Sequence, residues 1–265
     1  MITVERFETV DEASASVASG GIYYGGGTLV MRAVNYAEAG HDRLVRSTDP
    51  ALKTIDSNGT GLTLGAGVTM ADLMRARETE FLSSAARAVG GPAIRNAATI
   101  GGNLFASHPY GDFTTALLSL DAKVNSTIKT DEDIEQFLAS RGTHTGIVRS
   151  ISLQIPERGA FRFKKISRVK PKGISIMSIA ICLPQSAGRV TNARIAFGAM
   201  GPTPLRAKAA EQALEGSNLE ASAIERAVAA LENDLHPADD PIASAWYRRE
   251  VAPVHLKRLL SERQR

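Results

Sequence analysis

The sequence is poor in the residues that most often build metal sites and disulfides. Its 265 residues include one cysteine, Cys182, and five scattered histidines. A single cysteine excludes an internal disulfide framework, a cysteine-rich zinc site and an iron–sulfur cluster held by this chain alone. The histidines show neither an HExxH pattern nor a pair four residues apart, so we expect surface or loop histidines and no metal on this chain.

Long apolar runs are also missing. No stretch approaches the roughly 18 to 20 apolar residues that a membrane-spanning helix needs. The N-terminal segment carries Glu5, Glu8, Asp11 and Glu12, where a signal peptide would be basic and then apolar. Together with the single cysteine, these features predict a cytoplasmic protein. No Ser-His-Asp set and no paired carboxylates stand out, so no catalytic side chain is predicted.

Positive charge is concentrated in one segment. The net charge of +3 is too mild to require a nucleic-acid partner. Residues 158–172 nevertheless contain no carboxylate and seven basic residues, namely Arg158, Arg162, Lys164, Lys165, Arg168, Lys170 and Lys172. Such a run is often a solvated face, but it also suits an anionic cofactor or an acidic partner. Aromatic residues do not interleave with it in a stacking pattern, which disfavours nucleic acid.

The order of the predicted elements indicates an α+β chain with a boundary near residues 157–160. A hairpin is expected around Asn58 and Gly59, and residues 114–124 read as a helix that runs into a strand. Thr69 and Asp72 form a capping-box pattern at the start of a helix. Further helices are predicted at 9–19, 69–77, 81–90, 131–140, 204–216, 219–235 and 244–263, and strands at 151–156, 161–169 and 189–200.

Two glycine clusters, at residues 25–27 and 101–102, are the strongest functional signal. Tight turns explain either cluster alone, because glycine permits positive φ and close approach of the backbone. Neither cluster is a P-loop, since no Lys-Ser/Thr follows, and Val30 breaks the Rossmann fingerprint. The functional alternative is a pair of anion-binding nests, in which successive backbone N–H groups point at one phosphate each.

Short polar side chains accompany both clusters. Thr28 follows the first, and Thr99 and Asn103 flank the second. Asp112 lies nine residues beyond Asn103, where its carboxylate could accept hydrogen bonds from a ribose or ribityl diol. Capping of a loop is the alternative for this aspartate.

The stretches IYYGGGTLVM (22–31) and IRNAATIGGNLFASHPYGDFTTALLSLDA (94–122) resemble the FAD-binding subunits of the molybdenum hydroxylases, the xanthine dehydrogenase and carbon monoxide dehydrogenase family. The second stretch is the more specific, because TIGGNL is followed at a fixed spacing by a proline loop and an aspartate. The similarity covers most of the chain and is weakest between residues 123 and 145. It continues in GLTLGAGVTMADL, FKKISRVKPKGISI, RIAFGAMGPTPLRAKAAEQALEG and DPIASAWYRREVAPVHLKRLL.

The resemblance implies an α+β fold in two domains. Residues 1–158 would be a FAD-binding domain of the vanillyl-alcohol-oxidase or PCMH type, with subdomains at about 1–56 and 57–158. Residues 159–265 would form a C-terminal domain with an antiparallel sheet and helices.

The resemblance also implies where FAD binds. The backbone of residues 24–29 and 99–103 would wrap the pyrophosphate, and Asp112 would hold a diol. Lys164 would lie near the flavin ring, where a cation stabilises charge that accumulates on reduction. The predicted cofactor-binding residues are Tyr23, Tyr24, Gly25, Gly26, Gly27, Thr28, Leu29, Val30, Val89, Thr99, Ile100, Gly101, Gly102, Asn103, Asp112 and Lys164.

Two positions depart from the family. Leu29 stands where an acidic or small polar residue is usual, so that contact is lost or is made by the backbone. Val89 stands where some members carry an aromatic residue, which leaves an apolar wall in place of ring stacking.

In the implied complex, a molybdenum subunit hydroxylates the substrate, iron–sulfur clusters on a small subunit carry the electrons, and FAD on this chain delivers them to an external acceptor. The assembly would be a dimer of heterotrimers. The alternatives are a stand-alone flavin oxidoreductase of related fold, such as the cell-wall precursor reductases, and a non-enzymatic chain whose basic run binds an acidic partner. The substrate and the acceptor, whether quinone, oxygen, NAD or another carrier, are not predicted.

Overall fold

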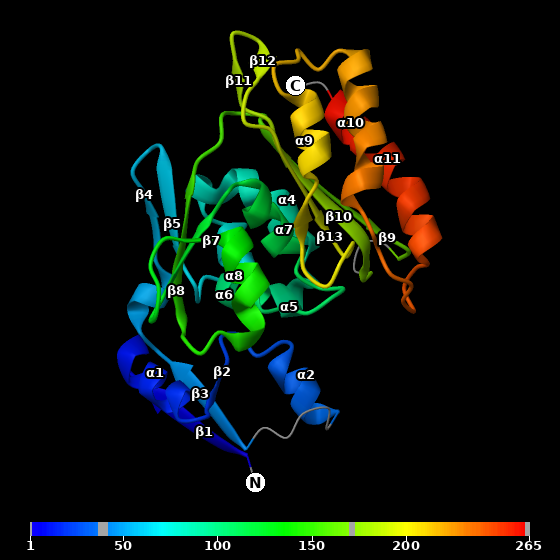
Figure 1. The fold of residues 1–265 in the computed structure, drawn as a ribbon. Helices are drawn as coiled ribbons and strands as arrows, with labels where there is room; N and C mark the ends of the chain where they lie inside the picture. The colour runs from blue at the N-terminus through cyan, green and yellow to red at the C-terminus, as the bar shows by residue number, and fades with distance from the viewer. Residues whose placement is uncertain (1, 37–41, 170–172, 263–265) are drawn as a thin grey trace. The chain divides into compact units, whose positions relative to one another are not determined.

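The computed structural model describes residues 2–36, 42–169 and 173–262. The chain forms two compact units, one from Met1–Ala106 and Asp121–Ile155 and the other from Ser107–Leu120 and Pro156–Arg265. Figure 1 shows the elements of both units. The domain limits 1–158 and 159–265 stay a prediction, and they do not include the packing of residues 107–120 within the second unit.

The first unit begins with a small parallel sheet in the order β1-β3-β2. Helix α1 packs against its strands, and the cap residue Thr9 forms a capping box with Glu12. Val10 and Ala13 of α1 and Leu44 and Val45 of β3 are buried. The elements are β1 (Thr3–Phe7), α1 (Val10–Ala18), β2 (Ile22–Tyr23), α2 (Val30–Asn35) and β3 (Arg43–Ser47).

The rest of the first unit contains a five-stranded antiparallel sheet in the order β4-β5-β8-β6-β7. The predicted hairpin is confirmed, and Asn58 Oδ1 accepts a hydrogen bond from Gly61 N–H at 2.6 Å. The capping box of Thr69 and Asp72 is confirmed as well. The strands are β4 (Ile55–Ser57), β5 (Gly61–Gly65), β6 (Lys123–Ser126), β7 (Glu132–Asp133) and β8 (Val148–Gln154).

Short helices lie in the segments that precede or connect these strands. α6 carries the second glycine cluster, and α4 ends just before the Gly90-Gly91-Pro92 terminator. The helices are η1 (Pro50–Lys53), α3 (Met70–Leu73), η2 (Arg77–Leu82), α4 (Ser83–Ala88), α5 (Pro92–Arg95), α6 (Ile100–Leu104), α8 (Ile134–Ser140) and η3 (Arg141–Thr143).

The second unit contains a four-stranded antiparallel sheet in the order β14-β13-β10-β9. Its strands are β9 (Phe161–Ser167), β10 (Ser175–Cys182), β13 (Arg194–Gly198) and β14 (Leu205–Arg206), and a hairpin is formed by β11 (Gln185–Ser186) and β12 (Arg189–Val190). Its helices are α7 (Asp112–Ser119), α9 (Lys208–Leu214), α10 (Ala221–Asp234) and α11 (Ala245–Ser261). The mixture of sheets and helices confirms the α+β prediction.

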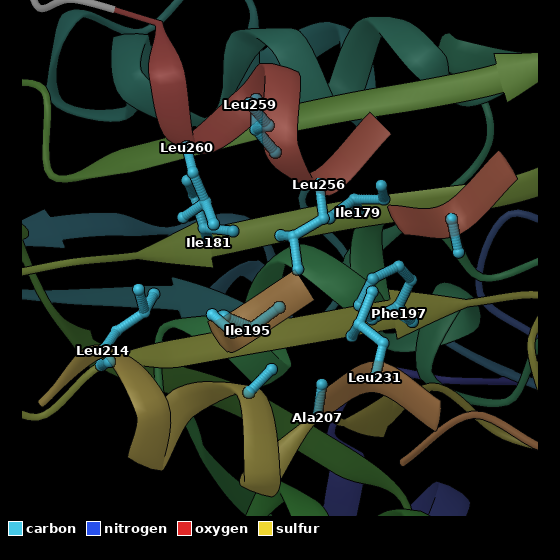
Figure 2. Packing of buried hydrophobic residues seen from close by; sticks show 14 of the residues in the cluster. Ile179, Ile181, Ile195, Phe197, Ala207, Leu214, Leu231, Leu256, Leu259 and Leu260 are labelled. Atoms are coloured by element: carbon cyan, nitrogen blue, oxygen red, sulfur yellow. The ribbon is translucent and has the colours of Figure 1, made fainter. Parts of the chain in front are cut away.

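Strand β10 divides the second unit into two packed layers. Its alternate residues Ile179 and Ile181 contribute to an apolar cluster with α9, α10 and α11, which Figure 2 shows around Leu256 and Leu231. Ser178 points to the opposite face, where its hydroxyl lies 3.2 Å from that of Thr115 in α7. Every residue of α7 is buried, so the sheet is covered on both faces.

Among the described residues, no helix combines the length and apolar character required to cross a membrane.

Candidate functional site

The first glycine cluster lies in a loop between β2 and α2. Tyr24 N–H donates to Val45 O at 3.0 Å, which fixes the start of the loop to β3. In the described chain, the N–H groups of residues 25–29 donate to no protein acceptor. These residues are only half-buried. The loop therefore offers five consecutive backbone donors to an external acceptor.

The loop packs directly against the residues that precede the second cluster. A Cβ atom on Gly26 would lie 1.6 Å from Ala97 O, and one on Gly25 would lie 2.6 Å from Thr99 Oγ1. No side chain fits in such a space, so glycine is required by packing as well as by any ligand. The structure thus brings two segments that are far apart in the sequence into contact, as a single composite site requires.

The second cluster uses its own backbone donors within the protein. Ile100 N–H donates to Val68 O at 2.9 Å, and Gly101 N–H donates to Ala66 O at 2.8 Å. Gly102 N–H donates to Thr99 Oγ1 at 3.1 Å, which makes Thr99 the N-cap of α6. The two clusters are therefore not equivalent nests in this conformation. Binding of a pyrophosphate by residues 99–103 stays a prediction.

The other predicted residues of the first unit lie on several elements. Tyr23 is half-buried in β2, and burial raises the pKa of its hydroxyl despite a hydrogen bond with the Ser47 backbone. The Tyr24 ring lies beside Gly27, whose φ of +70° is in the left-handed region. Val30 begins α2, and the half-buried Val89 follows α4. Contacts of these residues with a flavin or an adenine stay predictions.

Asp112 belongs to the second unit, where it is the first residue of α7 and only 7% exposed. Its Oδ2 lies 2.8 Å from Lys165 Nζ, and its Oδ1 accepts a hydrogen bond from Ser175 Oγ at 2.6 Å. The carboxylate thus joins α7 to β9 and β10. Each carboxylate oxygen has a second lone pair, so it has the capacity to accept a further hydrogen bond. Binding of a diol by Asp112 stays a prediction.

The predicted site residue Lys164 lies on a different face of its sheet from Asp112. Lys164 pairs with Ile179 in the sheet register and forms an ion pair with Glu262 at 3.7 Å, on the side of the helical cluster. Lys165 pairs with Ser178 and faces α7. Asp112 and Lys164 therefore lie on opposite faces of the same sheet. A role for Lys164 near the flavin ring stays a prediction.

Lys165 and Ser175 are candidate functional residues that were not predicted from the sequence. The alternation of β9 offered a signal, because Lys165 is two residues from Phe163 and four from Phe161, and so shares their face. A lysine on a buried face requires a carboxylate partner. Ser175 lies in β10, a strand that was not predicted.

Two other features of the second unit do not match the predicted site. A hollow of about 500 Å³ opens between α10 and α11, but none of the predicted cofactor residues lines it. Cys182 is buried, and burial raises the pKa of its thiol. In the ranges that the structure describes, no group of three or more His, Cys, Asp or Glu residues could hold a metal ion.

Comparisons with known proteins agree with the two-part organisation of the chain. Residues 1–156 match the family described as the FAD binding domain in molybdopterin dehydrogenase. Residues 161–263 match the CO dehydrogenase flavoprotein C-terminal domain.

Individual relatives extend the likeness over nearly the whole chain. A putative xanthine dehydrogenase FAD-binding subunit of Escherichia coli K12 is 28% identical, over 79% of this chain and 76% of the relative. Subunit alpha of the 6-hydroxypseudooxynicotine dehydrogenase complex of Paenarthrobacter nicotinovorans is 27% identical, over 96% of this chain and 92% of the relative.

A solved structure shares the fold. A chain of the reconstituted CO dehydrogenase from Oligotropha carboxidovorans aligns with a TM-score of 0.84 at 22% identity, covering 97% of this chain and 96% of that chain. Together with the family matches over residues 1–156 and 161–263, this confirms the prediction from the glycine motifs. The chain belongs to the FAD-binding subunits of the molybdenum hydroxylases, the family of oxidoreductases that includes xanthine dehydrogenase and CO dehydrogenase.

Proposed function

We propose that this chain holds FAD and thereby transfers electrons from iron–sulfur clusters on a partner subunit to an external acceptor. The observation that carries the proposal is the loop of residues 25–29, whose five N–H groups have no acceptor within the described protein. The loop rests on residues 97–99 in a chain whose family binds FAD. Bound FAD supplies the redox chemistry, and the protein supplies its binding, orientation and electrostatic environment.

The residues of the glycine site fit a pyrophosphate. Its oxygens are strong acceptors, and unobstructed backbone N–H groups are the donors that anion-binding nests use. Thr28 adds a hydroxyl group close to these donors. Leu29 has no polar side-chain atom, so its contribution is limited to its N–H group. We assign the predicted residues of the first unit to this site on that basis.

The assignments in the second unit concern side chains rather than backbone N–H groups. Asp112 is proposed to accept a hydrogen bond from a diol while it remains paired with Lys165 and Ser175. Lys165 places its ammonium group 2.8 Å from one oxygen of this carboxylate. Lys164 remains the proposed cation near the flavin ring.

Partner subunits are also part of the proposal. The relatives are named as subunits of dehydrogenases, one of them explicitly of a complex. We assign the iron–sulfur clusters to a small subunit, because this chain has only the buried Cys182. The molybdenum cofactor is assigned to a large subunit, and the proposed assembly is a dimer of heterotrimers in the cytoplasm.

The experiment that tests this function compares the native complex with and without its FAD. Both forms are reduced anaerobically with dithionite and then mixed with oxygen, a quinone or NAD, while the iron–sulfur absorbance is followed. We expect the iron–sulfur clusters of both forms to be reduced, but rapid reoxidation by at least one acceptor only in the form that holds FAD. Equal reoxidation rates for both forms with every acceptor would contradict the proposal.

A further inference from the structure

Ser175 begins β10, at the point where its side chain meets the start of α7. The residue is only 1% exposed. Its hydroxyl donates to Asp112 Oδ1 at 2.6 Å. A serine hydroxyl has one hydrogen to donate, and within the described ranges this hydroxyl has no other acceptor. The hydroxyl is therefore committed to the carboxylate of Asp112.

The carboxylate of Asp112 is held from two strands at once. Lys165 of β9 places its Nζ 2.8 Å from Oδ2, and Ser175 of β10 binds Oδ1. The torsion that turns a carboxyl group is broad when no partner restricts it. One partner on each oxygen fixes the plane of the group relative to the sheet. Without the Ser175 hydroxyl, only the Lys165 contact would remain, and the carboxylate could turn about it.

The backbone of β10 is irregular at the residue that makes this contact. Ser175 pairs with Ser167 of β9, and the register shifts before the next pair, Met177 with Ile166. Such a shift re-aims the side chains around it. Ile176 and Met177 both join the apolar cluster with α9, α10 and α11, whereas Ser175 reaches Asp112 of α7. The irregular register thus serves the contact between Ser175 and the carboxylate.

We propose that Ser175 is a positioning residue for FAD, whose hydroxyl presets the Asp112 carboxylate in the orientation that accepts a hydrogen bond from a diol of the cofactor. The inference rests on the proposed function, in which Asp112 accepts from that diol. Only 9% of the Asp112 side chain is exposed. A ligand can therefore approach over a small area, where the orientation of the carboxylate decides whether the hydrogen bond forms. Presetting removes the cost of ordering this group when the ligand binds.

Ser178 offers a matched control on the same strand. It is fully buried, and its hydroxyl lies 3.2 Å from that of Thr115 in α7. Both serines link β10 to α7 through a hydroxyl group, but of the two only Ser175 donates to Asp112. Ser178→Ala therefore removes a comparable contact and leaves the carboxylate as it is. A purely structural effect of Ser175→Ala would appear in both variants.

Titration of the FAD-free native complex with FAD tests the proposal, with binding followed by the fluorescence of the flavin. Wild type, Ser175→Ala and Ser178→Ala are compared, and chemical denaturation measures the stability of each without FAD. We expect both variants to lose stability to a similar extent. The dissociation constant for FAD should rise about three- to tenfold in Ser175→Ala, because the carboxylate must then be ordered on binding. In Ser178→Ala it should keep the wild-type value.

A second comparison places Ser175→Ala in an Asp112→Ala background. Because Ser175 acts through the carboxylate, its substitution should have no further effect on FAD affinity there. The same loss of affinity in both backgrounds would overturn the positioning role. If Ser175→Ala does not assemble, Ser175→Cys decides, since it keeps the size of the side chain but donates only weakly. Its FAD affinity should also fall, and a wild-type affinity overturns the proposal.

The remaining outcomes separate this inference from the proposed function. Equal effects of Ser175→Ala and Ser178→Ala on FAD affinity, or no effect of Ser175→Ala, overturn the positioning role. A complex that binds FAD equally well with and without Asp112→Ala overturns this inference alone and leaves FAD binding by the glycine loop in place. A wild-type complex that binds no FAD contradicts both.

Discussion

At the scale of single residues, the glycine site depends on one close approach. Gly26 lies where any side chain would occupy the position of Ala97 O, so the first glycine loop and the residues before α6 are mutually dependent. The motif spacing alone predicted the importance of both clusters. It could not show that Gly101 and Gly102 have their N–H groups occupied, because those acceptors, Ala66 O and Thr99 Oγ1, are set by tertiary packing.

We predict that Gly26→Ala reduces FAD retention strongly while the rest of the fold survives. The added Cβ atom must displace the loop from residues 97–99, at a cost of at least about 1–3 kcal/mol, and the five N–H groups then lose their common orientation. FAD content per chain after purification is the measurement. The matched control is Gly142→Ala, since a Cβ atom there meets nothing within 4 Å. Full FAD content in Gly26→Ala would remove the loop from the site.

At the scale of elements, the sequence predicted those that a few neighbouring residues encode and missed one that depends on tertiary packing. Helix α1 and helix α3 begin with capping boxes, and the hairpin of β4 and β5 carries an Asn-Gly turn, so each is encoded within a few residues. Strand β10 was missed because all eight of its residues are buried between two layers, which removes the alternation that indicates a strand.

Helix α7 shows that the packing of an element is harder to predict than the element itself. The sequence predicted it as a helix, but its packing on the sheet of the second unit depends on pairings across the fold. Gly198 permits this packing, because a Cβ atom there would lie 2.3 Å from both Ser178 Oγ and Thr115 Oγ1. The ion pair between Asp112 and Lys165 adds a polar anchor at the start of the helix.

We predict that Asp112→Ala destabilises the protein by about 3 kcal/mol, because it leaves the largely buried Lys165 without this partner. Lys165→Met in the same background should recover part of the loss. Chemical denaturation of the four proteins in this double-mutant cycle measures the coupling. Asp133→Ala is the control, since its pair with Lys123 is more exposed and should contribute below about 1 kcal/mol. Additive effects at Asp112 and Lys165 would show that the pair does not anchor α7.

At the scale of the whole molecule, the family could be predicted from the sequence because its glycine motifs stand where the backbone leaves no room for a side chain. This chain is 28% identical or less to the relatives compared above, yet its glycine clusters and downstream aspartate were enough to predict the family. The sequence could not show which face of β9 packs against α7, and therefore which of Lys164 and Lys165 lies beside Asp112, because this depends on the pairing of β9 with β10. Lys170 and Lys172 of the basic run lie outside the described residues. The single cysteine of this chain predicts that the iron–sulfur clusters of the complex lie on partner subunits.

The most direct test of the account is the composition of the native protein, purified from its own cells with whatever accompanies it. Visible absorption and mass spectrometry would be measured on the same sample. The account predicts flavin bands, about one FAD per copy of this chain, and co-purifying subunits that carry iron–sulfur clusters and molybdenum. A colourless chain that is isolated alone would contradict it.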